Sequence, residues 1–227
     1  MPASRARTFP QTRAKETYSA LLDAAQTVFA EKGFEAAQTP DIAAAAGVAV
    51  GTFYRYFTDK RQAFVEMIER HLLQAHDRVM ARLTPAAFDA LDPRAVVDGV
   101  IDLLFAEARR FPSLQGVYLA MSLSDPDVGR LRAEFEARAC AELSALIELL
   151  IPRARVPDPR AAAFVIQRAG LDLAVAEADP YLPRVDDHAV RAALGDMIYR
   201  YLFEPTVVTA PSPPAPTTPG RGLKRRR

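Results

Sequence analysis

The sequence is poor in the residues that build catalytic and metal centres. It has one cysteine, Cys140, and three histidines among 227 residues. A single cysteine excludes a disulfide within the chain and favours a reducing cytoplasm. His71 and His76 are five residues apart and share no helix face, and zinc-ligand spacings, a glycine-rich phosphate loop and a G-x-S-x-G turn are all missing. We therefore expect no metal, no cofactor and no enzymatic activity.

Long apolar runs are also missing, and so is a strong net charge. No apolar stretch approaches the roughly 20 residues of a membrane span, so we expect no membrane insertion. The formal charge of +1 hides an asymmetry: residues 1–15 carry four cations, residues 221–227 carry five, and neither segment has an acid. Residues 16–220 then hold 20 basic and 28 acidic residues, a net charge of −8. A polyanion should therefore meet the ends of the chain rather than its whole surface.

The apolar residues that are present recur at helical spacing almost everywhere. No sustained alternating stretch indicates a strand, and the pattern predicts an all-α fold of about nine helices. Gly33, Gly47 and a series of prolines mark where helices start or stop. The expected helices lie near residues 17–32, 39–46, 50–57, 60–82, 93–110, 113–122, 126–150, 160–178 and 187–203.

The two ends of the chain differ from its helical body. We expect residues 1–15 to form a basic, flexible arm, which is either a solvated leader or a segment that contacts DNA. Residues 205–227 are rich in proline, threonine and alanine and then basic, which predicts a disordered tail. Its cations either add nonspecific DNA affinity or keep the chain in solution.

The most informative stretch is TPDIAAAAGVAVGTFYRYFTDK, from Thr39 to Lys60. It predicts two short helices joined by a turn at Gly47, with Thr39 as the cap of the first. Phe53 and Phe57, four residues apart, should anchor the second helix inward. In a helix-turn-helix unit the outer face of that second helix can then enter a DNA major groove.

The groups expected on that outer face suit DNA. Hydroxyls, cations and a bare backbone fit phosphate oxygens and fix the register of the protein on the duplex. Base discrimination would fall to Val50, through a thymine methyl, or to Arg55, through guanine O6 and N7. The sequence leaves open which of the two dominates. The full set of expected DNA-contacting residues is Thr39, Val50, Gly51, Thr52, Tyr54, Arg55, Tyr56 and Lys60.

The motif AGVAVGTFYRYFTDK, preceded by a GF turn and an IA pair, resembles the TetR family of bacterial transcriptional regulators over residues 17–65. The resemblance implies a DNA-binding domain over residues 16–60 and a helical domain over residues 61–204 that binds a small-molecule effector and forms a homodimer. It also implies that a dimer binds palindromic operator DNA. The family's DNA contacts map onto Gly51, Thr52, Tyr54, Tyr56 and Lys60.

Two positions depart from the family pattern. Ala49 stands where a serine or threonine usually caps the recognition helix, a loss of about 1 kcal/mol of helix stability. Ala37 and Gln38 replace a common threonine pair. These departures keep an alternative open, a ligand-binding or protein-interaction module of the same fold that has lost DNA recognition. An activator or a co-repressor-dependent regulator is a further alternative to a ligand-released repressor.

The expected effector and dimer sites lie in the helical remainder. Helices 160–178 and 187–203 carry broad apolar stripes, on which residues such as Gly170 and Leu194 predict a four-helix seam between two protomers. Residues that combine apolar area with a few polar groups predict the pocket, although each of them taken singly is more often an ordinary core residue. They are Phe105, Tyr118, Met121, Gln167 and Leu171. We expect His71 to be a buried structural histidine.

Overall fold

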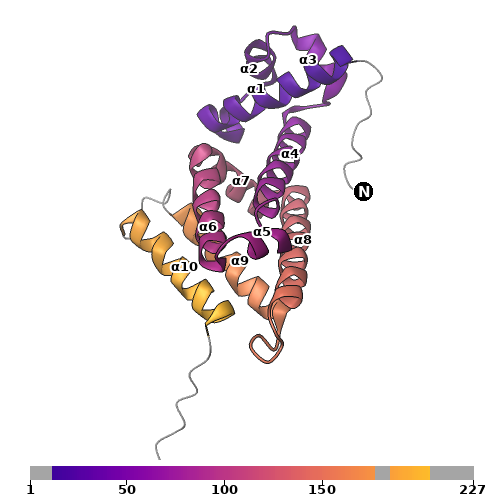
Figure 1. Cartoon of the computed structure of the whole chain (residues 1–227). Helices are drawn as coiled ribbons and strands as arrows, with labels where there is room; N and C mark the ends of the chain where they lie inside the picture. The colour runs from indigo at the N-terminus through magenta and orange to yellow at the C-terminus, as the bar shows by residue number, and fades with distance from the viewer. Residues whose placement is uncertain (1–11, 177–184, 205–227) are drawn as a thin grey trace, which may run out of the picture.

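The computed structural model describes residues 12–176 and 185–204, and within those residues the ordered elements are all helices. Figure 1 shows a small group of helices at one end and a larger group at the other, joined by α4. The helices are α1 (Thr12–Ala36), α2 (Thr39–Ala45), α3 (Val50–Tyr56), α4 (Lys60–Met80), α5 (Pro85–Ala90), α6 (Pro93–Arg110), α7 (Pro112–Ser124), α8 (Pro126–Leu150), α9 (Pro159–Ala176) and α10 (Asp187–Phe203).

The predicted all-α class is confirmed, and each of the nine expected helices has a counterpart. The short α5 is an additional element, which Thr84 caps by accepting from the backbone N–H of Ala87 at 3.2 Å. Gly33 has a φ of +74°, in the left-handed region, and interrupts α1 where a helix end was predicted. Proline and glycine therefore set most of the element boundaries.

Both ends of the chain fall largely outside the described residues. The helix α1 begins at Thr12, so the last four residues of the predicted arm are helical. The rest of that arm and the predicted tail at 205–227 lie outside the described residues.

We call α1, α2, α3 and the first turn of α4 the head. Its core is aromatic because apolar residues at helical spacing converge from all of these helices. Phe29 packs edge-on against Phe64 with ring centroids 5.1 Å apart, and Phe53 of α3 and Phe57, which directly follows α3, are fully buried. This core holds α3 on the outside of the head, with Val50, Tyr54 and Arg55 exposed and Thr52 and Tyr56 half-buried.

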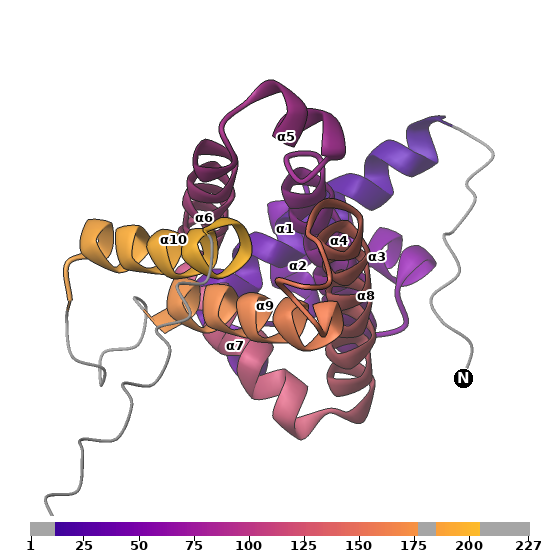
Figure 2. The same ribbon diagram turned by 60° about the horizontal axis from the view of Figure 1, so that its bottom comes forward.

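We call α5–α10 and the rest of α4 the body. Figure 2, in which the end opposite the head is turned toward the viewer, shows α4, α6, α7, α8 and α9 around a common interior with α10 on the outside of α6. The closest helix pairs are α8 with α9 and α6 with α10. Leu114, Met121 and Val128 of α7 and α8 belong to the same buried cluster as the head residues, so the two parts share a core. Among the described helices, none has the length and hydrophobicity of a membrane span.

Candidate nucleic-acid interface and effector cavity

The turn between α2 and α3 sets the geometry of the candidate DNA-binding surface. Gly47 has a φ of +67°, which an L-amino acid side chain rarely tolerates. Gln38, rather than Thr39, is the residue that precedes α2, and its backbone N–H donates to the Asp41 carboxylate at 3.0 Å. The predicted cap at Thr39 is therefore wrong, because that residue is already the first of the helix. Ala49 precedes α3 without a side-chain cap, as its sequence requires.

We call the outward side of α3 the recognition face. Tyr54 is 54% exposed and Val50 39% exposed, and Gly51 and Arg55 are exposed as well. A Cβ built on Gly51 meets no atom within 4 Å, so nothing inside the protein requires glycine there. The Tyr54 hydroxyl lies 3.0 Å from the Thr39 hydroxyl, which brings α2 and α3 together at the surface.

Thr52 and Tyr56 are half-buried and lie at the edges of the recognition face. The ring of Tyr56 lies 6.2 Å from that of Tyr18 on α1, and Tyr18 also stacks on Phe57 at 5.6 Å. The hydroxyl of Tyr18 donates to the Glu66 carboxylate at 2.5 Å. Aromatic contacts between α1 and the end of α3 therefore hold the recognition helix at a fixed angle.

Lys60 differs from the other predicted DNA contacts. Its ammonium donates to the backbone carbonyls of Phe34, Glu35 and Ala37 at 2.9, 2.9 and 3.1 Å. It also lies 4.9 Å from the centroid of the Phe34 ring. Lys60 thus satisfies the carbonyls at the end of α1 and fixes the start of α4 against them. To bind a DNA phosphate, the Lys60 ammonium would have to break these hydrogen bonds to the carbonyls.

The body encloses a cavity of about 800 Å³, a size typical of small-molecule sites. The helices α4 to α10 all contribute to its walls. Tyr118, Gln167 and Leu171 line it as predicted. Phe105 and Met121 do not, since Phe105 packs in the core between α6, α9 and α10 and Met121 packs toward the head. Both side chains stabilise the core. Helical periodicity alone could not distinguish a core residue from a cavity-lining residue.

Polar groups of the cavity that the sequence did not single out come mainly from α8. Glu136 accepts from Arg132 at 2.8 Å and lies 3.3 Å from Arg168, while the Gln167 amide donates to the Glu136 carbonyl at 3.1 Å. Burial raises the pKa of Tyr118 to about 12. The only sequence signal for the α8 groups was the four-residue spacing of Arg132 and Glu136, which is also common on solvated helices.

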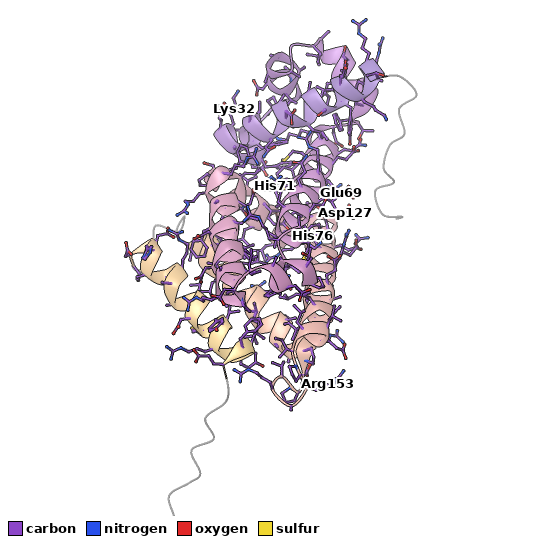
Figure 3. All side chains as sticks on the ribbon, in the orientation of Figure 1. Lys32, Glu69, His71, His76, Asp127 and Arg153 are labelled. Carbon is purple, nitrogen blue, oxygen red and sulfur yellow. The ribbon has the colours of Figure 1, made fainter. Side chains whose placement is uncertain are left out.

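His71 is buried where α4 meets both the head and the cavity, as the labelled side chain in Figure 3 shows. Its Nδ1 lies 3.4 Å from the amide nitrogen of Gln26 on α1, and its ring meets that of Phe111 edge-on. Burial lowers its pKa, which keeps the imidazole neutral at pH 7. In the described part of the chain, no group of three or more His, Cys, Asp or Glu residues is arranged to hold a metal ion.

A bridge of charged groups joins the head to the body at the start of α4. Arg61 donates to both oxygens of Asp125 at 2.5 and 2.7 Å and to Asp127 at 2.6 Å. Asp125 also accepts from the backbone N–H groups of Asp127 and Val128, so it caps α8. The guanidinium of Arg61 is the main cause of the lowered pKa of Asp125.

The outer faces of α9 and α10 expose apolar side chains. Phe164 and Val165 on α9 are 58% and 63% exposed, and Met197 and Tyr201 on α10 are 67% and 49% exposed. Leu194, predicted at the dimer seam, is instead buried within its own protomer. The exposed stripe of α10 lies on a different face of the helix from Leu194. It consists of Ala189, Ala193, Met197 and Tyr201.

These features define a helix-turn-helix DNA-binding protein whose helical body encloses a cavity. The family model "Bacterial regulatory proteins, tetR family" matches residues 21–67, and the model "Tetracyclin repressor-like, C-terminal domain" matches residues 92–202. The chain therefore belongs to the TetR family, which consists of transcriptional regulators, and its N-terminal part is their helix-turn-helix DNA-binding domain.

Individual relatives agree with this assignment. The transcriptional repressor KstR2 of Rhodococcus jostii is 36% identical over 81 residues, which are 36% of this chain and 38% of that protein. The regulator BetI of Cronobacter sakazakii is 29% identical over 135 residues, 59% of this chain and 66% of that protein. The chain thus matches less than two thirds of the length of these relatives. A TetR-family regulator from Mesorhizobium loti has the same fold, with a TM-score of 0.71 and 22% identity over 84% of this chain and 97% of that one.

Proposed function

We propose that this protein is a ligand-responsive repressor that binds a palindromic operator as a homodimer and leaves it when a small molecule occupies the cavity. The observation that supports this most directly is the recognition face. Gly51 without a packing role, the cation of Arg55 and the phenol of Tyr54 are exposed together there on one short helix. Folding alone gives no reason for their exposure.

Each group on the recognition face has a proposed partner on DNA. The hydroxyls of Thr39, Thr52, Tyr54 and Tyr56 would bind phosphate oxygens, and Gly51 would let the backbone approach the duplex closely. Val50 and Arg55 would contact base edges in the major groove. Lys60 would support this face by holding α4 against the end of α1, where its ammonium already binds three carbonyls.

Dimerisation through α9 and α10 would place two recognition faces on one duplex. The exposed apolar side chains on both helices, Phe164, Val165, Met197 and Tyr201, are suited to a seam that excludes water. A two-fold axis through that seam would set the two α3 helices about 34–36 Å apart, the repeat of successive major grooves.

Release by an effector would work through α4. This helix begins in the head at Lys60, and further along it lines the cavity with His71 and Val79. A ligand that binds better to a body with a displaced α4 would shift the dimer toward head spacings that no longer fit the operator. The same coupling requires operator DNA to weaken effector binding by an equal factor.

The proposal is tested by selecting genomic fragments that bind the protein and measuring their affinity by fluorescence anisotropy. We expect sequence-specific binding that weakens steeply with salt. Arg55→Ala should lower operator affinity by roughly 5- to 150-fold if Arg55 holds a base edge. Arg153→Ala is the matched control, because Arg153 is 66% exposed at the far end of the body (Figure 3).

Other outcomes would favour the other functions. Loss of specific binding to any duplex would indicate a module of this fold without DNA recognition, for which the uncapped Ala49 is the structural argument. Tighter operator binding in the presence of effector would indicate a co-repressor. A reporter whose output falls when the gene is deleted would indicate an activator.

A further inference from the structure

We propose that the cavity takes an uncharged, largely hydrocarbon molecule with one hydrogen-bonding oxygen, and that it rejects a carboxylate or an amine of the same length. This inference rests on the proposed function, because it assigns a chemical class to the effector. It depends on the charges, the apolar walls and the free hydrogen-bonding groups of the cavity.

The walls of the cavity are predominantly aliphatic and aromatic. Side chains from seven helices, α4 to α10, meet there, and they offer a ligand dispersion contacts and removal of hydrocarbon from water rather than polar recognition. Representative residues from the successive helices are Leu72 and Val79 of α4, Leu104 of α6, Leu119 of α7, Leu143 and Ile147 of α8, Ile166 of α9 and Ile198 of α10.

The charged groups of the cavity are already neutralised by the protein itself. In the described part of the chain, five charged residues line it, and each has an ion-pair partner: Glu107, Arg132, Glu136, Arg168 and Asp172. Glu136 is shared by Arg132 and Arg168, and Arg168 also meets Asp172 at 2.9 Å. Glu107 binds Arg78 through two hydrogen bonds of 2.8 and 2.6 Å. When Arg78, the partner of Glu107 outside the lining, is included, three cations face three carboxylates, and the net charge of these six groups is zero.

This balance disfavours a charged ligand. A carboxylate that leaves water costs several kcal/mol unless a cation compensates it. To obtain a cation from Arg168 it would have to displace Asp172, which then has no ion-pair partner among the cavity arginines, or Glu136, which then keeps only Arg132. An ammonium is disfavoured for the corresponding reason: each carboxylate at the cavity is already paired with an arginine, which the ammonium would have to displace. An uncharged molecule breaks none of these pairs.

One turn of α7 supplies the hydrogen-bonding groups that remain. Gln115 and Tyr118 are three residues apart, so they share a helix face, and both line the cavity. Neither side chain forms a hydrogen bond to the rest of the described structure. Tyr118 is half-buried and burial raises its pKa to about 12, so its phenol is an uncharged donor at pH 7. A hydroxyl, ketone or ether oxygen could accept from it without adding charge.

The experiment uses the full-length protein without DNA and the uncharged fluorophore N-phenyl-1-naphthylamine as a probe. Decan-1-ol, decanoate and decylamine compete for the probe at pH 7, and all three carry the same alkyl chain. We expect decan-1-ol to displace the probe at a concentration about tenfold lower than either ion. Equal or better displacement by decanoate or decylamine would overturn the proposal, and so would failure of the probe or of decan-1-ol to bind.

Two variants test the physical cause. Glu136→Gln removes one carboxylate and leaves the cavity with a surplus cation, so decanoate should gain about tenfold relative to decan-1-ol. Glu134→Gln, an exposed neighbour on α8 that does not line the cavity, should leave the ratio unchanged. Tyr118→Phe should weaken decan-1-ol about fivefold, the loss of one hydrogen bond. A ratio that does not move in Glu136→Gln would refute the argument from charge.

The ligand preference and the regulatory function fail separately. Binding to the free protein establishes or refutes the preference, whatever the protein does on DNA. Operator release by decan-1-ol is then measured by anisotropy. Selective binding of decan-1-ol without release would contradict the repressor mechanism but support the proposed ligand class. Release by decanoate alone would contradict the ligand class but support the repressor mechanism.

Discussion

Some side chains in the head are buried and stabilise its core, and others are exposed and contribute little to the packing. The burial of Phe53 and Phe57 and the exposure of Tyr54 follow from their spacing along one short helix, and the sequence predicted all three. The position of Lys60 could not be predicted in this way. Its three carbonyl partners lie 23 to 26 residues earlier, just after the break at Gly33, and only the folded chain brings them to the ammonium.

Gly51→Ala separates the role of this position in folding from its role on DNA. Since a Cβ at Gly51 meets no atom within 4 Å, alanine should leave the melting temperature unchanged or raise stability by up to about 1 kcal/mol. Operator affinity should nevertheless fall, because the added methyl group holds the backbone away from phosphate. Thermal denaturation and anisotropy measure the two effects. Gly116→Ala on α7, which is equally open, should leave operator affinity unchanged, and an equal loss in both variants would contradict a DNA contact at Gly51.

Lys60→Met tests whether Lys60 is chiefly a structural residue. Methionine keeps most of the aliphatic volume but removes the donor to three carbonyls, so we expect a loss of about 1–3 kcal/mol in the free energy of unfolding. Urea denaturation measures it. Lys15→Met, an exposed lysine on α1, should change stability little. Unaltered stability of Lys60→Met together with weakened operator binding would show that this lysine acts on phosphate instead.

Among the helices, the boundaries were predictable and the packing faces were not. Pro93, Pro126 and Asp187 mark the starts of α6, α8 and α10 as expected, because proline and acidic residues favour the first turn of a helix. The apolar stripe on α10 is broad enough to serve either its own protomer or a second one. The fold directs Leu194 inward and leaves Met197 exposed, a choice that depends on where α6 lies. For the same reason Phe105 and Met121 could not be told apart from cavity residues.

The contact between α4 and α8 predicts a pH dependence. Arg61 lowers the pKa of Asp125 below its ordinary value of 3.8, so the folded protein keeps this carboxylate ionised where the unfolded chain already binds a proton. The resulting stabilisation is fully present above 3.8 and is lost as the pH falls through the lowered pKa.

Asp125→Asn tests this dependence. Asparagine still caps α8, so the variant isolates the ion pair. We expect a loss of about 1 kcal/mol near pH 7, reduced by the partial exposure of Arg61, and convergence with the wild type near pH 2. Urea denaturation across this range measures the difference. Asp89→Asn, an exposed residue of α5, is the control, and a constant gap between Asp125→Asn and wild type at every pH would contradict the ion-pair origin.

For the whole molecule, the proposed two-fold assembly depends on the outer surface of α9 and α10. Phe164→Asp and Met197→Asp each place a charge in that seam, so we expect the protein to sediment as a monomer and operator affinity to drop by more than tenfold. Analytical ultracentrifugation measures the oligomeric state. Leu123→Asp is the matched control, because Leu123 on α7 is 80% exposed and lies outside the proposed seam. Dimers that persist in both seam variants would place the interface elsewhere.

The buried cluster that runs from Phe29 and Phe64 through Leu114 to Val128 joins the DNA-binding head to α7 and α8 of the body in one core. Cutting the chain after residue 60 would strip α1 of its cover from α7 and expose its apolar side to water. The first sixty residues are therefore not an independent domain that could be fused to another ligand-binding domain through a flexible linker. A hybrid regulator built from this protein has to carry α7 and the start of α8 along with the DNA-reading helices.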